Sequence, residues 1–179
     1  KSLFMPTRAV HIRPEGSKDL EAIYAIHGAA FATSAEADLV NALRDQTQPL
    51  LSLVAEDSDS QALVGHILFS PVKLTGHGQL TLTGLAPLAV LPTHQNQGIG
   101  STLVRSGLGQ GRQRGWDGVV VLGHPHFYHR FGFRTAAEWE IRCEYEVPEE
   151  AFMVLELRPG SLQGRSGTIQ YADPFKALG

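Results

Sequence analysis

The stretch that decides the fold is Leu88-Ala89-Val90-Leu91-Pro92-Thr93-His94-Gln95-Asn96-Gln97-Gly98-Ile99-Gly100-Ser101. Its apolar start predicts a strand, and its polar middle predicts a loop that leads into a helix at Gly98. The first turn of a helix has backbone N–H groups without partners and carries the positive end of the helix dipole. Glycine also lets the backbone approach a ligand closely. The stretch therefore predicts an anion site, with a phosphate lying against Gly98, Gly100 and Ser101.

Other phosphate-binding loops match this stretch poorly. A P-loop requires a lysine after its last glycine, whereas Gly100 is followed by Ser101. A dinucleotide-binding fingerprint requires a third glycine at position 103, which is Leu103. Gly107 and Gly111 fall inside the predicted helix on the same face as Leu103. Close packing on a sheet explains these two glycines better than ligand binding does.

Strand and helix patterns alternate along the rest of the chain. Helices are predicted from Ser17 to about residue 31, from Ser34 to about residue 43, from Gly98 to about residue 114, and from Pro125 to before Gly132. Strands are predicted at 10–13, 51–56, 62–72, 79–90, 119–122, 141–145, 152–157 and 168–171. Pro87 cannot donate to a strand ladder, so we expect a bulge or an unpaired edge there. The pattern indicates one mixed α/β domain.

Composition excludes several function classes. The chain has 179 residues, 42% of them hydrophobic, which suits one domain with a sizeable core. A net charge of −3 creates no overall field that would attract nucleic acid or an anionic membrane. Cys143 is the only cysteine, which excludes an internal disulfide and a CxxC zinc site. No carboxylate or cysteine accompanies the histidines at 124, 126 and 129, so no metal is expected.

The sequence also predicts where the protein works. No apolar run approaches the ~18 residues of a membrane span, and the N-terminus lacks the features of a signal peptide. We therefore expect a cytoplasmic protein that binds neither nucleic acid nor a membrane.

Two motifs together resemble a known family. Gln95-x-x-Gly98-x-Gly100, after an apolar strand, resembles the acyl-CoA pyrophosphate motif Q/R-x-x-G-x-G/A of the GNAT superfamily of N-acetyltransferases. Residues 127–133, Phe-Tyr-His-Arg-Phe-Gly-Phe, resemble the FY…GF segment that follows the fifth strand of that family. The order of the predicted elements is also similar. Residues 84–90 and 123–125 most resemble the branch of YhbS-like predicted acetyltransferases.

The resemblance implies a domain organisation. It implies a mixed and mostly antiparallel sheet, flanked by helices, in which the parallel fourth and fifth strands splay apart. Residues 10–158 would form the acetyltransferase domain, and residues 159–179 a C-terminal extension packed on it. Residues 1–9 would be an N-terminal extension or the remnant of a trimmed or tagged chain.

The resemblance further implies acetyl-CoA as the co-substrate, bound in the gap between the fourth and fifth strands. The backbone of Leu88, Ala89 and Val90 would pair with the pantetheine arm, and the Leu88 N–H would polarise the thioester carbonyl. The residues expected at the pyrophosphate are Gln95, Asn96, Gln97, Gly98, Ile99, Gly100 and Ser101. The acceptor would be an amine of a small molecule or of a protein or peptide, and the protein a monomer or homodimer.

Tyr128 is the candidate acid for the leaving thiolate. The conjugate thiol titrates near ~8.5 and a phenol near ~10, so a tyrosine stays protonated at neutral pH and can donate its proton. The alternative is that Tyr128 only packs beside Phe127 and Phe131.

The base for the attacking amine stays open. An amine with a pKa near ~10.4 must lose a proton before it attacks. Many GNAT relatives place a glutamate on the fourth strand, but residues 84–86 here are Gly-Leu-Ala. The candidates are Glu36, Glu56, His66 and His124. His124 is best placed by sequence, although it equally suits a cap for the helix at Pro125. A non-catalytic acyl-CoA-binding or sensor module is the main alternative to an enzyme.

Overall fold

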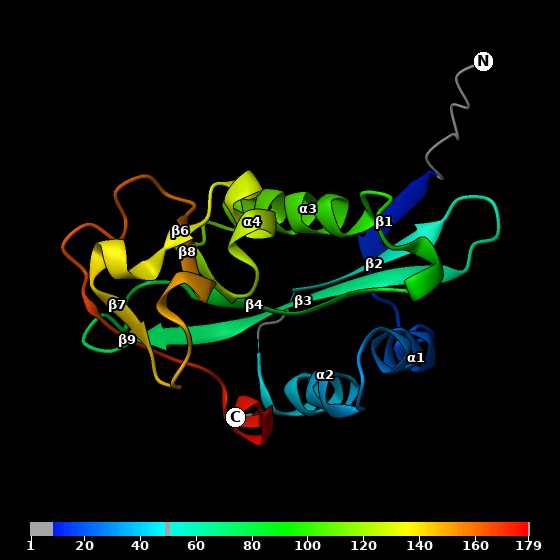
Figure 1. The fold of residues 1–179 in the computed structure, drawn as a ribbon, viewed down its shortest axis with the longest axis horizontal. Coiled ribbons are helices and arrows are strands. Elements are labelled where there is room, and N and C mark those ends of the chain that lie inside the picture. The colour runs from blue at the N-terminus through cyan, green and yellow to red at the C-terminus, as the bar shows by residue number, and fades with distance from the viewer. Residues whose placement is uncertain (1–8, 49–50, 179) are drawn as a thin grey trace, which may run out of the picture.

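A twisted mixed sheet runs the length of the molecule in the computed structural model, which describes residues 9–48 and 51–178 (Figure 1). The strands of the described residues are β1 (Val10–Pro14), β2 (Leu51–Asp57), β3 (Leu63–Leu74), β4 (Leu82–Val90), β5 (Gly118–Leu122), β6 (Arg134–Thr135), β7 (Ile141–Cys143), β8 (Phe152–Glu156) and β9 (Gly167–Gln170). Their order is β1-β2-β3-β4-β5-β8-β6, with β9 between β3 and β7. The pairs β4–β5 and β7–β9 are parallel and the other pairs are antiparallel, which confirms the predicted mixed sheet.

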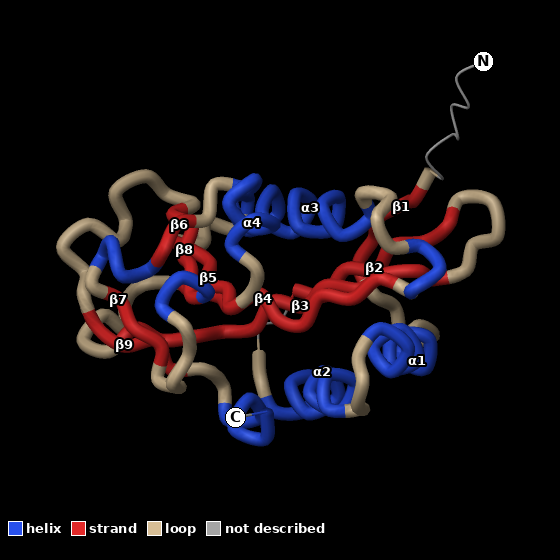
Figure 2. Tube along the Cα trace, viewed as in Figure 1, coloured by secondary structure: helices blue, strands red, loops and turns tan. Residues whose placement is uncertain are grey.

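Helices cover both faces of this sheet (Figures 1 and 2). The α-helices of the described residues are α1 (Leu20–Ala30), α2 (Ala35–Gln46), α3 (Ile99–Gln113) and α4 (Pro125–Tyr128). The pair α1 and α2 lies on one face, and α3 and α4 lie on the other. Leu103, Val104 and Leu108 of α3 pack into the main apolar core, because their spacing places them on one side of the helix.

Strand β4 leaves its neighbours at the point that Pro87 marks. Between Leu85 and Leu88, three steps along β4 face two steps along β3, so β4 bulges at Ala86 and Pro87. The ladder to β5 covers only residues 82–84 of β4. The expected bulge and the expected divergence of the fourth and fifth strands are both confirmed. Residues 85–90 of β4 consequently carry backbone groups that β5 does not pair.

The glycines inside α3 pack closely, as predicted. A β-carbon on Gly107 would lie 2.3 Å from the Phe69 ring of β3, and one on Gly111 would lie 2.4 Å from Trp116. Only glycine therefore lets α3 approach the sheet this closely.

Some predicted boundaries were wrong. Helix α1 begins after Asp19 and not at Ser17, because the Asp19 carboxylate holds the turn before the helix through the Gly16 N–H. The strand predicted to reach Tyr145 ends at Cys143, and the two-residue strand β6 was not predicted. Strand β9 and the 3-10 helix η5 (Asp173–Leu178), in the expected extension, pack against β3 and α2. The proposal for residues 1–9 falls almost entirely outside the described residues.

Candidate functional site

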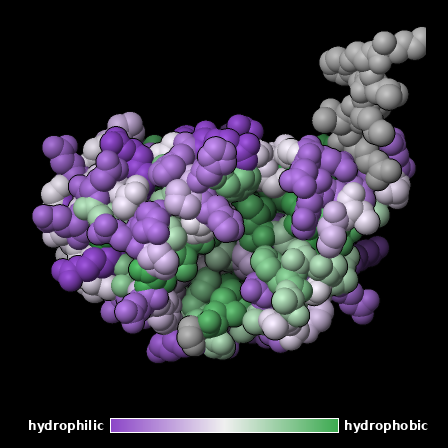
Figure 3. Space-filling view, in the orientation of Figure 1, coloured by the Kyte–Doolittle hydropathy of each residue, from purple (hydrophilic) through white to green (hydrophobic). Residues whose placement is uncertain are grey.

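A cleft of about 950 Å³ opens where β4 and β5 diverge. It runs from the loop before α3, along the free edge of β4, to α2 and the C-terminal 3-10 helix η5. On the face seen in Figure 3, apolar residues gather around a hollow in the middle of the molecule, between the positions of α4 and α2. One continuous cavity thus connects the predicted phosphate loop with the opposite face of the sheet.

The phosphate loop forms one end of the cleft. Gly98 adopts a left-handed conformation, with φ of +82°, and serves as the N-cap of α3. A residue with a side chain would be strained there, so glycine is favoured at this turn. The Gln95 side chain donates a hydrogen bond of 3.0 Å to the Val90 carbonyl and holds the loop against β4. The first residues of α3 line this end of the cleft, where a helix start leaves backbone N–H groups without intrahelical partners.

Arg130 supplies a positive charge at this end that the sequence motifs do not predict. Its guanidinium stacks 4.8 Å from the centre of the Phe127 ring, and Nη2 lies 3.5 Å from the Ser101 hydroxyl. The signal in the sequence was the position of Arg130 inside the segment that carries Tyr128. The guanidinium and the N-terminus of α3 together favour a polyanion here.

Most of the predicted cofactor residues lie together. Those that line the cleft are Leu88, Val90, Gln95, Asn96, Gly98, Ile99, Gly100 and Ser101. The side chain of Ala89 is buried among its neighbours and the side chain of Gln97 is exposed, and neither lines the cleft. Ala89 contributes only its backbone to the β4 edge.

Tyr128 lines the same cleft as Leu88. The residue is 8% exposed, and the centre of its ring lies 4.9 Å from that of Phe127 and 5.6 Å from that of Phe133. A β-carbon on Gly123 would lie 2.5 Å from the ring, so Gly123 makes room for it. Burial raises the pKa of Tyr128 to about 12, which keeps the phenol protonated at any physiological pH.

The structure divides the four candidate bases into two groups. Glu36, from the first turn of α2, and His124, from the turn after β5, both line the cleft. His124 occupies the N-cap position of α4, but its side chain makes no capping hydrogen bond. These two side chains are therefore available to a ligand in the cleft.

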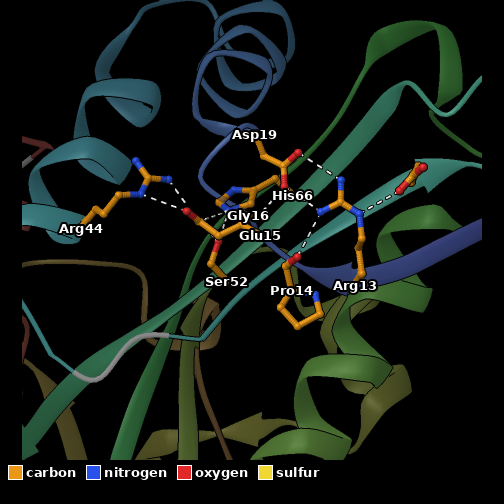
Figure 4. Close-up of polar contacts among 9 residues, drawn as sticks. Arg13, Pro14, Glu15, Gly16, Asp19, Arg44, Ser52 and His66 are labelled. Atoms are coloured by element: carbon orange, nitrogen blue, oxygen red, sulfur yellow. Dashed lines mark hydrogen bonds and ion pairs between the residues drawn. The ribbon is translucent and has the colours of Figure 1, made fainter.

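His66 and Glu56 do not line the cleft, because each belongs to a polar network elsewhere. His66 is fully buried on β3, where its Nε2 lies 2.7 Å from the Ser52 hydroxyl. Ser52 in turn donates to Glu15, which Arg44 binds through two guanidinium nitrogens (Figure 4). Glu56 accepts a hydrogen bond of 2.8 Å from Arg13.

Two further findings concern metals and membranes. Among residues 9–48 and 51–178, no group of three or more His, Cys, Asp or Glu side chains is placed to hold a metal ion. Within the same residues, no helix has the length and apolar character needed to cross a bilayer.

Comparison with known proteins places these features in a family. Residues 11–136 match the model of the acetyltransferase (GNAT) domain. The uncharacterised N-acetyltransferase YhbS of Escherichia coli is 39% identical over 164 residues, which is 92% of this chain and 97% of YhbS. The crystal structure of YhbS in complex with CoA matches with a TM-score of 0.89 over 95% of this chain and 93% of that chain, at 38% identity.

A second solved structure is also similar at the level of sequence. It is a GNAT family acetyltransferase from Brucella melitensis in complex with acetyl-CoA. Its TM-score is 0.75 and its identity is 34%, over 94% of this chain and 99% of that chain.

Proposed function

The chain belongs to the GNAT family of acetyltransferases. We propose that it moves the acetyl group of acetyl-CoA directly to a primary amine. The single observation that carries the proposal is the continuous cleft. It joins an anion-binding helix start, an unpaired strand edge and a buried tyrosine in one cavity. A ternary complex needs both substrates side by side, and a cavity open to both faces of the sheet admits them together.

The residues present fit acetyl-CoA. The start of α3 and Arg130 suit the pyrophosphate, and the β4 edge suits an extended chain carrying amide groups, such as pantetheine. YhbS from Escherichia coli was crystallised with CoA and the Brucella relative with acetyl-CoA, which supports the same ligand here. The bound thioester would supply the activated acetyl group.

Leu88 and Tyr128 would act on opposite sides of the reacting carbon. The Leu88 N–H lies just beyond the bulge, where β5 offers it no partner. It would donate to the carbonyl oxygen as negative charge develops there. The phenol of Tyr128, which burial keeps protonated, would give its proton to the departing thiolate.

The experiment measures cofactor binding and turnover separately. We expect CoA to raise the melting temperature of the protein, and acetyl-CoA with a panel of primary amines to release free thiol. Stabilisation by CoA without thiol release from any amine would favour a non-catalytic acyl-CoA-binding module. Absence of both effects would contradict the proposal and leave the glycine loop without a cofactor.

A further inference from the structure

The half of the cleft on the α2 side has a distinct chemistry. Its walls are apolar and are formed by Phe31, Leu39, Ala86, Pro87 and Leu178. Among the residues that the structure describes, Glu36 is the only Asp or Glu that lines the cleft, and it lies in this half. This half therefore presents one carboxylate on an otherwise apolar surface.

The Glu36 carboxylate lacks a partner within the described residues. Its Oε2 is shielded from solvent and has no hydrogen-bond partner, and the side chain forms no ion pair with any residue that the structure describes. A buried carboxylate oxygen without a donor is costly, so a ligand that brings a donor gains binding free energy there. A cationic N–H donor satisfies both the hydrogen-bonding capacity and the charge.

The charges of the cleft also give it a direction. Arg130 is the only Lys or Arg that lines the cleft within the described chain, and it lies at the phosphate end. A polyanionic cofactor is attracted to that end and a cation to the end with Glu36. A carboxylate on the carbon that bears the amine would lie near Glu36 without a cation to pair with it, which disfavours amino acids.

We propose that the acceptor is a primary amine on an apolar alkyl or arylalkyl body, and that Glu36 binds its ammonium group and takes its proton. This proposal rests on the transferase function proposed above. His124 is the weaker candidate, because its side chain is exposed to solvent and does not require a ligand to satisfy it.

The proton balance is complete with the groups named. Glu36 takes one proton from the ammonium, directly or through one water, which frees the lone pair of the amine. The C–N bond forms as the C–S bond breaks, and Tyr128 protonates the thiolate. The nitrogen, now bonded to the acetyl carbon, loses a second proton. This proton returns to the Tyr128 oxygen and replaces the one that Tyr128 gave to the thiolate. Glu36 then releases its proton to solvent, so the transfer yields the amide, the free thiol and one proton.

The test compares 2-phenylethylamine with phenylalanine, which differ only by the carboxylate, on the wild type, E36Q and E21Q. Glu21 is an exposed residue of α1 outside the cleft, so E21Q is the matched loss of one negative charge. We expect the wild type and E21Q to acetylate phenylethylamine with a kcat/KM about 10-fold or more above that for phenylalanine. E36Q should lose about 100-fold in that reaction while CoA binds with unchanged affinity.

A binding measurement keeps this test independent of turnover. Phenylethylamine should raise the melting temperature of the CoA-bound wild type and of E21Q, but not that of E36Q. If no thiol is released but phenylethylamine stabilises the wild type and not E36Q, the proposed transferase function is wrong and the proposed amine site is supported. Turnover of E36Q within 3-fold of the wild type, a preference for phenylalanine, or no amine-dependent stabilisation of the wild type would overturn the proposal.

Discussion

His27 Nε2 lies 2.7 Å from His66 Nδ1, and neither imidazole has any exposed surface. The contacts continue from His66 to Ser52 and from Ser52 to Glu15, and Glu15 determines which nitrogen donates in this hydrogen bond. Glu15 can only accept, so Ser52 donates to it and must accept from His66 Nε2–H. His66 Nδ1 then accepts from His27 Nε2–H. Each ring is therefore neutral, with its proton on Nε2.

This pair predicts a loss of stability in acid. Burial lowers the pKa of His27 to about 4 and that of His66 well below its ordinary value of 6.5. Between pH 6.5 and 4 the unfolded chain binds protons that the folded protein does not, so the free energy of unfolding falls as pH falls. The slope should reach about 1.4 kcal/mol per pH unit for each histidine. Urea unfolding from pH 7.5 to 4.5 measures it.

Variants separate this effect from general acid denaturation. H66Q should be less stable at pH 7.5 but have a shallower slope below pH 6.5, because one buried histidine is gone. H11Q changes an exposed histidine of β1 and should retain the wild-type slope. Equal slopes in H66Q and the wild type would contradict the assignment of the effect to the buried pair.

Two glycines on α3 predict opposite effects of the same substitution. A β-carbon at Gly107 would lie 2.3 Å from Phe69, whereas one at Gly109 would have no atom within 4 Å. G107A should cost about 1–3 kcal/mol of unfolding free energy, because the core must shift. G109A should stabilise by about 0.5–1 kcal/mol, since alanine favours the helix. Chemical denaturation of both variants tests this, and equal effects would argue against the close approach of α3 to the sheet.

Structural features that depend on only a few consecutive residues could be predicted from the sequence. Pro87 predicted the bulge because a missing N–H breaks a ladder wherever it occurs, and Gly107 predicted close packing because it falls on the buried face of a helix. The phosphate loop could be predicted for the same reason, since its strand, glycines and helix follow one another in the sequence.

Features that depend on contacts between residues far apart in the sequence could not be predicted. Glu36 and Leu88 come from α2 and β4, and only the packing of helix pair on sheet brings them to one cleft. His66 looked like a candidate base because its strand position did not reveal His27 and Ser52 beside it. Arg130 was missed since its role depends on Ser101, which lies 29 residues away.

Arg130 should contribute to cofactor affinity but not to chemistry. R130Q removes the charge beside Ser101, so the Kd for CoA should rise about 5-fold at low salt, with kcat unchanged at saturating acetyl-CoA. The difference from the wild type should shrink at 0.5 M salt, because exposed charges are screened over a few ångströms. R112Q, on the exposed face of α3 and outside the cleft, is the control and should bind CoA normally. Calorimetric titration measures both variants, and a Kd equal to that of the wild type in R130Q would remove Arg130 from the phosphate site.

Tyr128 should affect chemistry but not affinity. Y128F keeps the ring that packs against Phe127 and Phe133 and removes only the hydroxyl, which makes no hydrogen bond within the described residues. The stability and the Kd for CoA should therefore stay near the wild-type values. The kcat for amine acetylation should fall about 100-fold, as expected when a general acid is removed.

The pH profile adds a readout that a purely structural role for Tyr128 would not change. Because the pKa of Tyr128 is about 12, the phenol does not titrate below pH 10 and cannot limit the wild-type rate there. The remaining activity of Y128F should grow relative to the wild type with acetyl-donor thioesters whose thiols are more acidic, since such leaving groups need no proton. An aryl thioester of acetate is the probe. An equal loss with acetyl-CoA and with the aryl thioester would mean that Tyr128 positions the substrate and does not protonate the thiolate.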